Sequence, residues 1–310
     1  MPMPHRTQMQ LIRRRLVGKD GAERVRELRG ILLELPNYKN GPYADIRKWV
    51  VAEMDATRSR ARIVHRDSIA VRREGAAQIA LVGPPNAGKS SLLHALSDVQ
   101  IKIGNYAFTT LRPVPALVRI DGVLVQFVEI PGLLEGANED RGGGRAYLGV
   151  LREADAIVYC QDALDSSTGL LAVMAEVERA AIARPALVAA TKMDEADAAV
   201  LARLSSTFPA LPIVPTSILD EASLEQLKRA AWQLTGLIRV YVRQGQATAG
   251  EPFALPADST ALDVAHAIHS DLARSFKAAR VWGPSGRFDG QRIGRDHVVQ
   301  DTDTLEILTM

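Results

Sequence analysis

One segment, Gly83-Pro84-Pro85-Asn86-Ala87-Gly88-Lys89-Ser90, limits the folds open to this chain more strongly than any other feature. It follows the apolar run Gln78–Val82 and precedes a helical pattern over Leu92–Leu96. A strand, a glycine-rich loop and a helix in this order are the context of a P-loop, in which backbone N–H groups and the helix N-terminus surround phosphate. An ordinary glycine-rich turn does not require that context. The segment therefore predicts an α/β fold with a phosphate site beside a mostly parallel sheet.

Within this loop, the residue types indicate how a nucleoside triphosphate and its metal would be held. We expect Lys89 to reach the β- and γ-phosphates and the Ser90 hydroxyl to bind Mg²⁺, which takes oxygen ligands. The residues expected to line the nucleotide phosphates are Pro85, Asn86, Ala87, Gly88, Lys89, Ser90 and Ser91.

The rest of the chain divides into three regions by its hydrophobic patterns. Residues 1–75 are rich in arginine and have helical spacing, residues 76–236 alternate strand-like and helix-like runs, and residues 237–310 form a small α+β unit. Asp121-Gly122 between two apolar runs predicts a β-hairpin in the middle region. Helical patterns there cover Leu170–Ala183 and Glu195–Leu204. We therefore predict a helical N-terminal region, a nucleotide-binding domain and a C-terminal domain.

A second motif, Thr191-Lys192-Met193-Asp194, indicates which base is bound. It follows the strand-like run Ala186–Ala190, and ligands of open α/β folds bind at that edge of the sheet. The Asp194 carboxylate can accept hydrogen bonds from guanine N1 and N2, a pattern that adenine lacks, while the Lys192 stem can lie along the base. The motif is similar to the NKxD guanine motif of GTPases, and Ser217-Ile218 is similar to their last guanine loop. An ATP-dependent enzyme is the less favoured alternative.

Two further segments fall where GTPases carry their switches. Phe108, Thr109 and Thr110 follow the first predicted helix, and a threonine there can bind Mg²⁺ and sense the γ-phosphate through its N–H. Glu129 and Gly132 stand where GTPases have Asp-x-x-Gly. We expect Glu129 to contact Mg²⁺ through water and the Gly132 N–H to bind the γ-phosphate. The longer glutamate side chain casts doubt on the hydrolytic rate rather than on binding.

These residues together resemble the Obg/DRG branch of GTPases. The carriers of the resemblance are Phe108-Thr109-Thr110-Leu111, Pro131-Gly132-Leu133-Leu134-Glu135-Gly136-Ala137 and the glycine-rich run 141–145. The segments around Phe276-Lys277, Ala279–Gly283 and His297 are similar to the TGS domain of the DRG group. The resemblance implies a P-loop GTPase domain over 76–236 and a ubiquitin-like β-grasp domain over 237–310. Obg's glycine-rich N-terminal domain and the large insertion of eukaryotic DRG proteins are absent.

The resemblance also bears on the mechanism. Leu133 stands where Ras-like enzymes place a water-orienting glutamine, and Asn86 resembles the asparagine that helps to hold potassium in some GTPases. We therefore expect slow, K⁺-stimulated hydrolysis of GTP to GDP, with Lys89, Thr110, Gly132 and Asn86 as the catalytic group. An arginine in cis, from Arg112, Arg141 or Arg145, is an alternative source of positive charge. A further alternative is a module that senses guanine nucleotides with negligible turnover, which Glu129 favours.

Charge is unevenly distributed and suggests a partner. Residues 1–75 hold 17 Lys and Arg against 9 Asp and Glu, whereas the rest of the chain holds 21 against 27. Such asymmetry favours a nucleic-acid partner, so we expect the N-terminal region, with the TGS-like domain, to bind the ribosome or a structured RNA. A solvated helical surface is the plain alternative. One cysteine, Cys160, and no long apolar run predict a cytoplasmic protein without membrane attachment, and we expect no sequence-specific reading of DNA.

Overall fold

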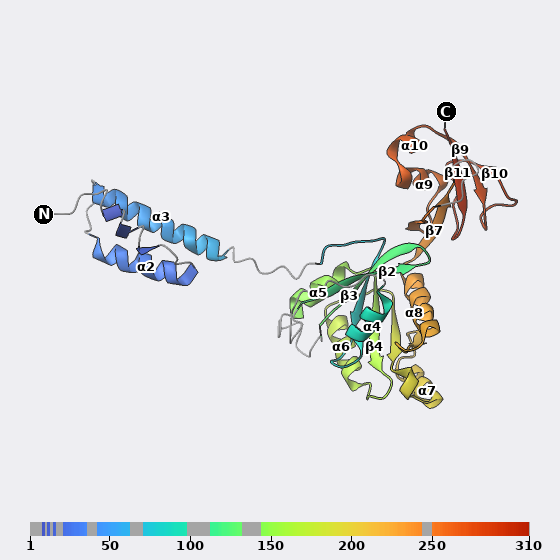
Figure 1. Ribbon diagram of the computed structural model, residues 1–310, viewed down its shortest axis with the longest axis horizontal. Helices are drawn as coiled ribbons and strands as arrows, with labels where there is room; N and C mark the ends of the chain where they lie inside the picture. Colours follow the sequence, from blue (N-terminus) through green and yellow to red (C-terminus); the bar gives the residue numbers. More distant parts are fainter. Residues whose placement is uncertain are drawn as a thin grey trace. The chain divides into compact units, whose positions relative to one another are not determined.

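The computed structural model describes residues 8–9, 11–12, 15–16, 21–35, 42–62, 71–97, 112–131, 144–243 and 250–309. It consists of two compact units, Met1–Ser68 and Ile69–Met310, shown in Figure 1. The domain boundaries that the sequence suggests after residues 75 and 236 remain predictions.

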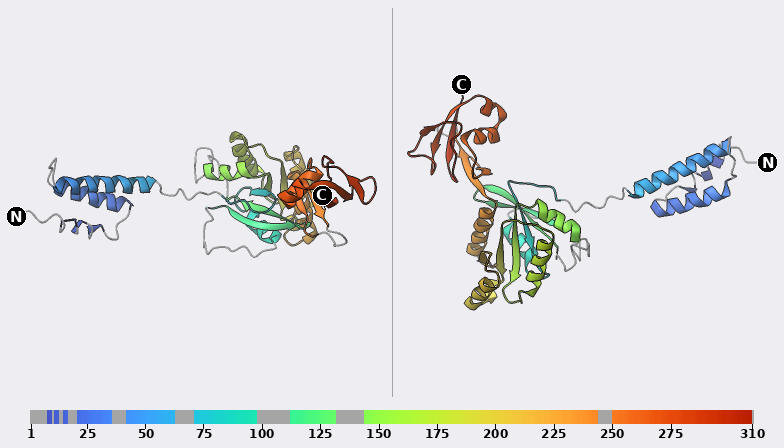
Figure 2. Two further views of the ribbon diagram at one scale, coloured as in Figure 1. Left: turned by 90° about the horizontal axis from the view of Figure 1, so that it is seen from above. Right: turned by 180° about the vertical axis from the view of Figure 1, so that it is seen from behind.

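The N-terminal unit is helical, as its pattern predicts, and its two long helices form a hairpin. Helices α2 (Gly21–Glu34) and α3 (Pro42–Arg62) lie side by side in Figures 1 and 2. Their apolar stripes meet in one small core, in which Leu28 and Ile31 of α2 pack with Ile46 and Val50 of α3. The core is formed within the hairpin itself, although Leu33 of α2 and Val51 of α3 remain exposed on its surface.

A six-stranded sheet forms the centre of the second unit. Its strands lie in the order β2-β3-β1-β4-β5-β6, and all neighbours are parallel except β2 and β3. Their bounds are β1 Gln78–Val82, β2 Val114–Ile120, β3 Val123–Glu129, β4 Ala156–Asp162, β5 Ala186–Thr191 and β6 Ile213–Pro215. The predicted hairpin is confirmed, because Asp121 and Gly122 both take the positive φ that its tight turn requires.

Helices cover both faces of this sheet, which explains why its central strands are mostly apolar. On one face, α4 (Lys89–Leu96) and α8 (Glu221–Leu234) contribute to a core that includes Ile79 and Phe127. On the other face, α5 (Gly144–Glu153), α6 (Thr168–Arg179) and α7 (Ala198–Thr207) pack over residues such as Val128. Figure 1 shows α5 and α6 on the side of the sheet opposite α8. The predicted α/β class is confirmed.

Two helix predictions were wrong at their ends. The helix predicted over Leu170–Ala183 ends at Arg179, and Ala181 then takes a left-handed φ of 53°. The helix predicted from Glu195 begins only at Ala198, because the Asp197 side chain accepts the Val200 N–H and caps the helix there. A short 3₁₀ helix, Met193–Glu195, precedes it. The pattern also missed α5, α10 (Ser270–Arg274) and β10 (Gln291–Ile293).

The C-terminal domain is a five-stranded sheet in the order β10-β9-β11-β7-β8. Its remaining elements are β7 Leu237–Val242, β8 Phe253–Pro256, α9 Ala261–Ile268, β9 Phe276–Trp282 and β11 Thr304–Thr309. The first and last strands, β7 and β11, run parallel in the middle, as the β-grasp prediction requires. Trp282 is half-buried, with the Arg243 guanidinium 4.5 Å from its ring centre. No helix among the described residues has the length and apolar character needed to cross a membrane.

Candidate functional site

The described motif residues gather at one edge of the six-stranded sheet. The P-loop follows β1, Glu129 is the last residue of β3, and Thr191 is the last residue of β5. Ser217 follows β6 by two residues. Since β1, β3, β5 and β6 all point the same way, their carboxyl ends meet at the same edge. Segments spread over more than 130 positions of the sequence are thereby brought to one site.

Lys89 is a buried cation whose described hydrogen-bond acceptors are two carbonyl oxygens of the loop. Its side chain is 6% exposed, and Nζ donates to the carbonyl oxygens of Gly83 at 2.9 Å and Pro84 at 2.8 Å. The structure gives it no carboxylate partner among the residues that it describes. Burial lowers the pKa of Lys89, since a charge is costly away from water, and the nearby Glu129 charge opposes this shift only in part. An ammonium group has three donors, so the third can serve an anionic ligand at this loop.

The loop is packed tightly against β4. A Cβ atom at Gly83 would lie 2.4 Å from the carbonyl oxygen of Cys160, so only glycine fits there without displacing the backbone. Cys160 is fully buried, and burial raises the pKa of its thiol to about 12. Cys160 is therefore a packed residue of β4 rather than a nucleophile, because the thiolate needed for nucleophilic chemistry is disfavoured.

Thr191 joins the guanine motif to the phosphate loop. Its hydroxyl lies 3.0 Å from the carbonyl oxygen of Ala87 in the loop and 3.2 Å from that of Gln161 in β4. A hydroxyl has one hydrogen to donate, which these two buried carbonyls share. Thr191 therefore fixes the distance between the two halves of the site, although it replaces the asparagine usual at this position.

Ser90 and Glu129 place two hard oxygen atoms together. The Ser90 hydroxyl donates to Glu129 Oε1 at 2.6 Å, so the longer glutamate reaches the hydroxyl directly. Hydroxyl and carboxylate oxygens are the donors that Mg²⁺ takes beside nucleotide phosphates. The residues present therefore fit Mg²⁺, with Ser90 and Glu129 as the side chains that would hold it.

Asp194 and Ser217 form the expected guanine end of the site. The Ser217 hydroxyl donates to Asp194 Oδ1 at 2.5 Å and accepts the Leu219 N–H at 3.1 Å. Ser223 supports this loop from α8, because its hydroxyl lies 3.0 Å from both the N–H and the carbonyl oxygen of Ser217. Asp194 and Ile218 are exposed and Ser217 is buried, so the Asp194 carboxylate is oriented and open to a base.

Asp162, the last residue of β4, holds Lys192 and is not among the site residues predicted from the sequence. Lys192 Nζ lies 2.5 Å from Asp162 Oδ2, and this bond raises the pKa of Lys192. Lys192 also has a left-handed backbone, with φ of 58°. A carboxylate at the end of a buried strand next to β5 was the available signal, since strand ends share the site edge.

The other predicted residues differ in how much the structure says of them. Pro85, Asn86 and Ser91 are exposed, and Asn86 has a left-handed φ of 64°, a conformation that asparagine tolerates. Arg112 and Arg145 are exposed. The predicted residues that lie outside the described part of the chain are Phe108, Thr109, Thr110, Gly132, Leu133 and Arg141.

Comparison with known proteins agrees with this geometry. Residues 78–192 match the family described as 50S ribosome-binding GTPase, and residues 238–309 match the TGS domain. An uncharacterized GTP-binding protein of Methanocaldococcus jannaschii is 29% identical, covering 82% of this chain and 83% of that protein. One from Halobacterium salinarum is 28% identical over 77% of this chain and 85% of its own length.

A eukaryotic relative extends the likeness. The developmentally-regulated GTP-binding protein 1 of Xenopus laevis is 26% identical, covering 77% of this chain and 84% of that protein. The first match falls on the six-stranded sheet and the second on the five-stranded sheet of the second unit. The P-loop lies within the first match, and the guanine motif begins at its end. The chain is therefore a DRG-like GTP-binding protein, with a GTPase domain of the ribosome-binding family followed by a TGS domain.

Proposed function

We propose that this protein hydrolyses GTP to GDP and phosphate, slowly and with stimulation by potassium, and that it acts as a switch on the ribosome or a structured RNA. The observation that carries the hydrolytic part is Lys89, a buried ammonium whose described partners are two loop carbonyls. Such a group gains most from an anionic ligand. Its place beside Ser90 and Glu129 suits a triphosphate rather than a single phosphate.

The chain's own residues would divide the work of phosphoryl transfer. Lys89 stabilises charge on the β- and γ-phosphate oxygens, while loop N–H groups and the α4 N-terminus orient them. Asp194 selects guanine, and Thr191 holds the two halves of the site at a constant separation. Mg²⁺, when bound by Ser90 and Glu129, would neutralise charge between the β- and γ-phosphates. The contributions proposed for Thr110 and Gly132 rest on the sequence.

Potassium stimulation rests on Asn86. Its side chain is exposed on the loop, and an amide oxygen is a suitable ligand for a hard monovalent cation. GTP turnover should be several-fold faster in KCl than in NaCl at equal ionic strength, and Asn86→Ala should remove the difference. His94→Ala, at an exposed position of α4 outside the phosphate-lining set, is the matched control. Equal rates of the unchanged protein in both salts would exclude the potassium role.

A module that senses guanine nucleotides without turnover is the second candidate. It is favoured by Glu129, whose carboxylate contacts Ser90 directly rather than standing off as the shorter aspartate would. Single-turnover hydrolysis separates the candidates, because a sensor binds GTP but leaves it intact over hours. If Glu129 is the cause of slow chemistry, Glu129→Asp should raise the single-turnover rate while GTP affinity changes less.

The RNA-directed part of the proposal rests on two arginine-bearing surfaces. On α2, Arg26 and Arg29 are exposed and one helical turn apart. On the TGS sheet, Arg280 of β9 and Arg292 of β10 lie opposite each other on neighbouring strands. Arg243 stacks on Trp282, which lies two residues after Arg280 on β9. Arginine beside an aromatic ring suits phosphate contact and base stacking.

Co-sedimentation with ribosomes and with a structured RNA over rising KCl tests the partner. Affinity should fall steeply with salt, because binding releases counterions. Deletion of residues 1–68 should weaken binding, whereas GTP turnover without RNA should be retained. Undiminished RNA binding after the deletion would remove the N-terminal unit from the proposal. We expect the protein in the cytoplasm, where its partner is found.

A further inference from the structure

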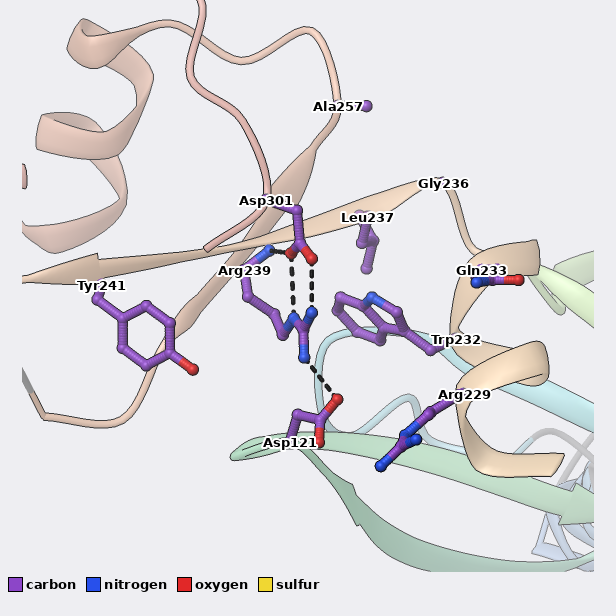
Figure 3. Close-up of a pocket in the computed structure, with 10 residues that line it drawn as sticks. All are labelled: Asp121, Arg229, Trp232, Gln233, Gly236, Leu237, Arg239, Tyr241, Ala257 and Asp301. Atoms are coloured by element: carbon purple, nitrogen blue, oxygen red, sulfur yellow. Dashed lines mark hydrogen bonds and ion pairs between the residues drawn. The ribbon is translucent and has the colours of Figure 1, made fainter. Parts of the chain in front are cut away.

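The tip of the β2–β3 hairpin is attached to the TGS domain by an arginine that two aspartates share. Arg239 of β7 donates from Nη1 to Asp121 at the tip of the hairpin, and from Nε and Nη2 to Asp301 at 3.0 and 2.5 Å. Figure 3 shows the guanidinium between the two carboxylates, beside the indole of Trp232. Asp121 belongs to the GTPase domain, while Arg239 and Asp301 belong to the TGS domain. The cluster therefore spans the boundary between the two domains.

Two other contacts bring the same tip against the TGS domain. Arg119 of β2 pairs with Glu251 at 2.8 Å, and Gly122 lies so close to Pro252 that a Cβ atom would be 2.8 Å from its ring. Gly122 also has a φ of 92°, so glycine is required at this point for two reasons. The TGS domain thus contacts the hairpin at three neighbouring residues, 119, 121 and 122.

The hairpin connects this junction to the nucleotide site. Its ladder is unbroken from Ile120 paired with Val123 to Val114 paired with Glu129. At the rise of a strand, that length is about 20 Å. Glu129 contacts Ser90, and β2 begins three residues after Leu111, the end of the predicted first switch. A hydrogen-bonded ribbon therefore joins the nucleotide end of the hairpin to its tip.

Arg239 makes more hydrogen bonds to Asp301 than to Asp121, and this difference decides which of the two contacts breaks first. Asp301 accepts two guanidinium bonds and also the Arg239 backbone N–H at 2.7 Å. Asp121 accepts one bond and its side chain is 42% exposed, against 17% for Arg239. Arg239 therefore stays with the TGS domain when the junction moves, and its bond to Asp121 is the one that breaks.

We propose that the Asp121–Arg239 contact is a latch through which the nucleotide state sets the position of the TGS domain. The proposal rests on the nucleotide binding of the proposed function but does not require hydrolysis. The latch closes when the hairpin tip lies against β7, and a shift of the hairpin at Glu129 withdraws Asp121 from Arg239. The contact lines a pocket of about 740 Å³ together with Trp232 and Tyr241, so its opening changes a surface between the domains.

Spin-label distances in the full chain test this directly. Cys160 is the only cysteine and is buried, so Ala172→Cys on α6 and Ala267→Cys on α9, both at exposed positions, can be labelled selectively. Distances would be measured by pulsed electron paramagnetic resonance with GDP and with a non-hydrolysable GTP analogue. We expect the mean distance to differ between the two nucleotides.

Two substitutions at position 121 weaken or remove the contact with Arg239 while keeping the turn of the hairpin. Asp121→Asn keeps a neutral acceptor and Asp121→Gly removes it, and both residues are favoured at this positive φ. The nucleotide-dependent shift should shrink in Asp121→Asn and be lost in Asp121→Gly. Asp289→Asn, an exposed carboxylate of the TGS domain away from the junction, should retain the full shift.

The outcomes separate the latch from the function on which it rests. A full shift in Asp121→Gly, or identical distances with both nucleotides in the unchanged protein, would overturn the latch. GTP turnover is measured on the same samples. Absence of turnover with a normal distance shift would contradict hydrolysis and leave the latch standing.

Discussion

The phosphate loop and the N-terminal hairpin are both marked by positive charge, but they use it in opposite ways. Lys89 has only loop carbonyls as described partners, so its charge is available to a ligand. In the hairpin, Arg24 bonds Glu53 at 2.8 Å and the Leu16 carbonyl at 3.1 Å, and Arg47 bonds the carbonyls of Leu32 and Leu35. One buried lysine thus makes a ligand site, while several arginines hold two helices together.

This difference changes what the basic excess of residues 1–75 means. Arg15 also is occupied within the unit, pairing with Glu27 and Glu34. Arg26 and Arg29 are exposed, and the structure gives them no carboxylate partner among the residues it describes. The net charge of the sequence therefore overstates the surface available to RNA, because part of it is neutralised inside the fold.

The largest effect should come from removing the cation of the phosphate loop. Lys89→Ala deletes charged hydrogen bonds to phosphate, each of about 1.5–3 kcal/mol. GTP and GDP affinity, measured by calorimetry, should fall by roughly 100-fold or more. Lys228→Ala is the matched control, since that lysine pairs with Glu225 on α8. The affinity of this variant for GTP and GDP should be unchanged. Nucleotide binding by Lys89→Ala within a few-fold of the original would contradict the assignment of the site.

A smaller effect should follow from cutting the link between the two halves of the site. Thr191→Val keeps the shape but removes the hydroxyl that serves Ala87 and Gln161. With a buried bond worth about 1 kcal/mol and its acceptors left unpaired, GTP affinity should fall by about tenfold. Thr191→Ser should retain most of the affinity. Equal losses in both variants would show that packing, rather than the hydroxyl, matters here.

The contrast between these regions also explains what the sequence could predict. The P-loop and Thr191–Asp194 are recognisable because residue types recur at short, constant spacing beside a strand end. The parallel sheet follows from alternating apolar runs. The positions of the two motifs relative to each other then follow from the sheet alone, since carboxyl ends of parallel strands share an edge.

Contacts between distant residues could not be predicted in this way. The pairing of Lys192 with Asp162 and of Arg239 with Asp121 depends on strand order and domain packing, which no local pattern specifies. The same holds for the arginines of the hairpin, because those that bond within the described part of the unit and those that are exposed look alike in sequence. Helix ends were missed where a single side chain, such as Asp197, sets the start.

A paired substitution in the hairpin should separate structural from exposed arginines. Arg47→Gln removes bonds to two carbonyls at the end of α2 and should lower the free energy of unfolding by about 1 kcal/mol. Arg29→Gln should change stability by less than about 0.5 kcal/mol. If Arg29 contacts phosphate, Arg29→Gln should reduce the salt slope of RNA binding by about one. Chemical denaturation measures the free energy of unfolding, and a KCl titration measures the salt slope of RNA binding. Equal destabilisation by the two variants would contradict the distinction between structural and exposed arginines.

The smallest effect concerns acid stability, where the two units can be compared directly. The bond to Arg239 lowers the pKa of Asp301, and the bond to Arg15 lowers that of Glu34. A carboxylate whose folded pKa lies below its unfolded value, near 3.9 for Asp and 4.3 for Glu, stabilises the fold above that unfolded value. This stabilisation is lost as the pH falls through the folded pKa.

Thermal unfolding followed from pH 7 to pH 2.5 should therefore show Asp301→Asn and Glu34→Gln less stable than the original protein at pH 7. The differences should shrink toward pH 2.5. The Glu34 effect should be the smaller one, because that side chain is 62% exposed and water screens its pair, whereas Asp301 is 38% exposed. A Glu34 effect equal to that of Asp301, or a difference that grows in acid, would contradict this account of the two pairs.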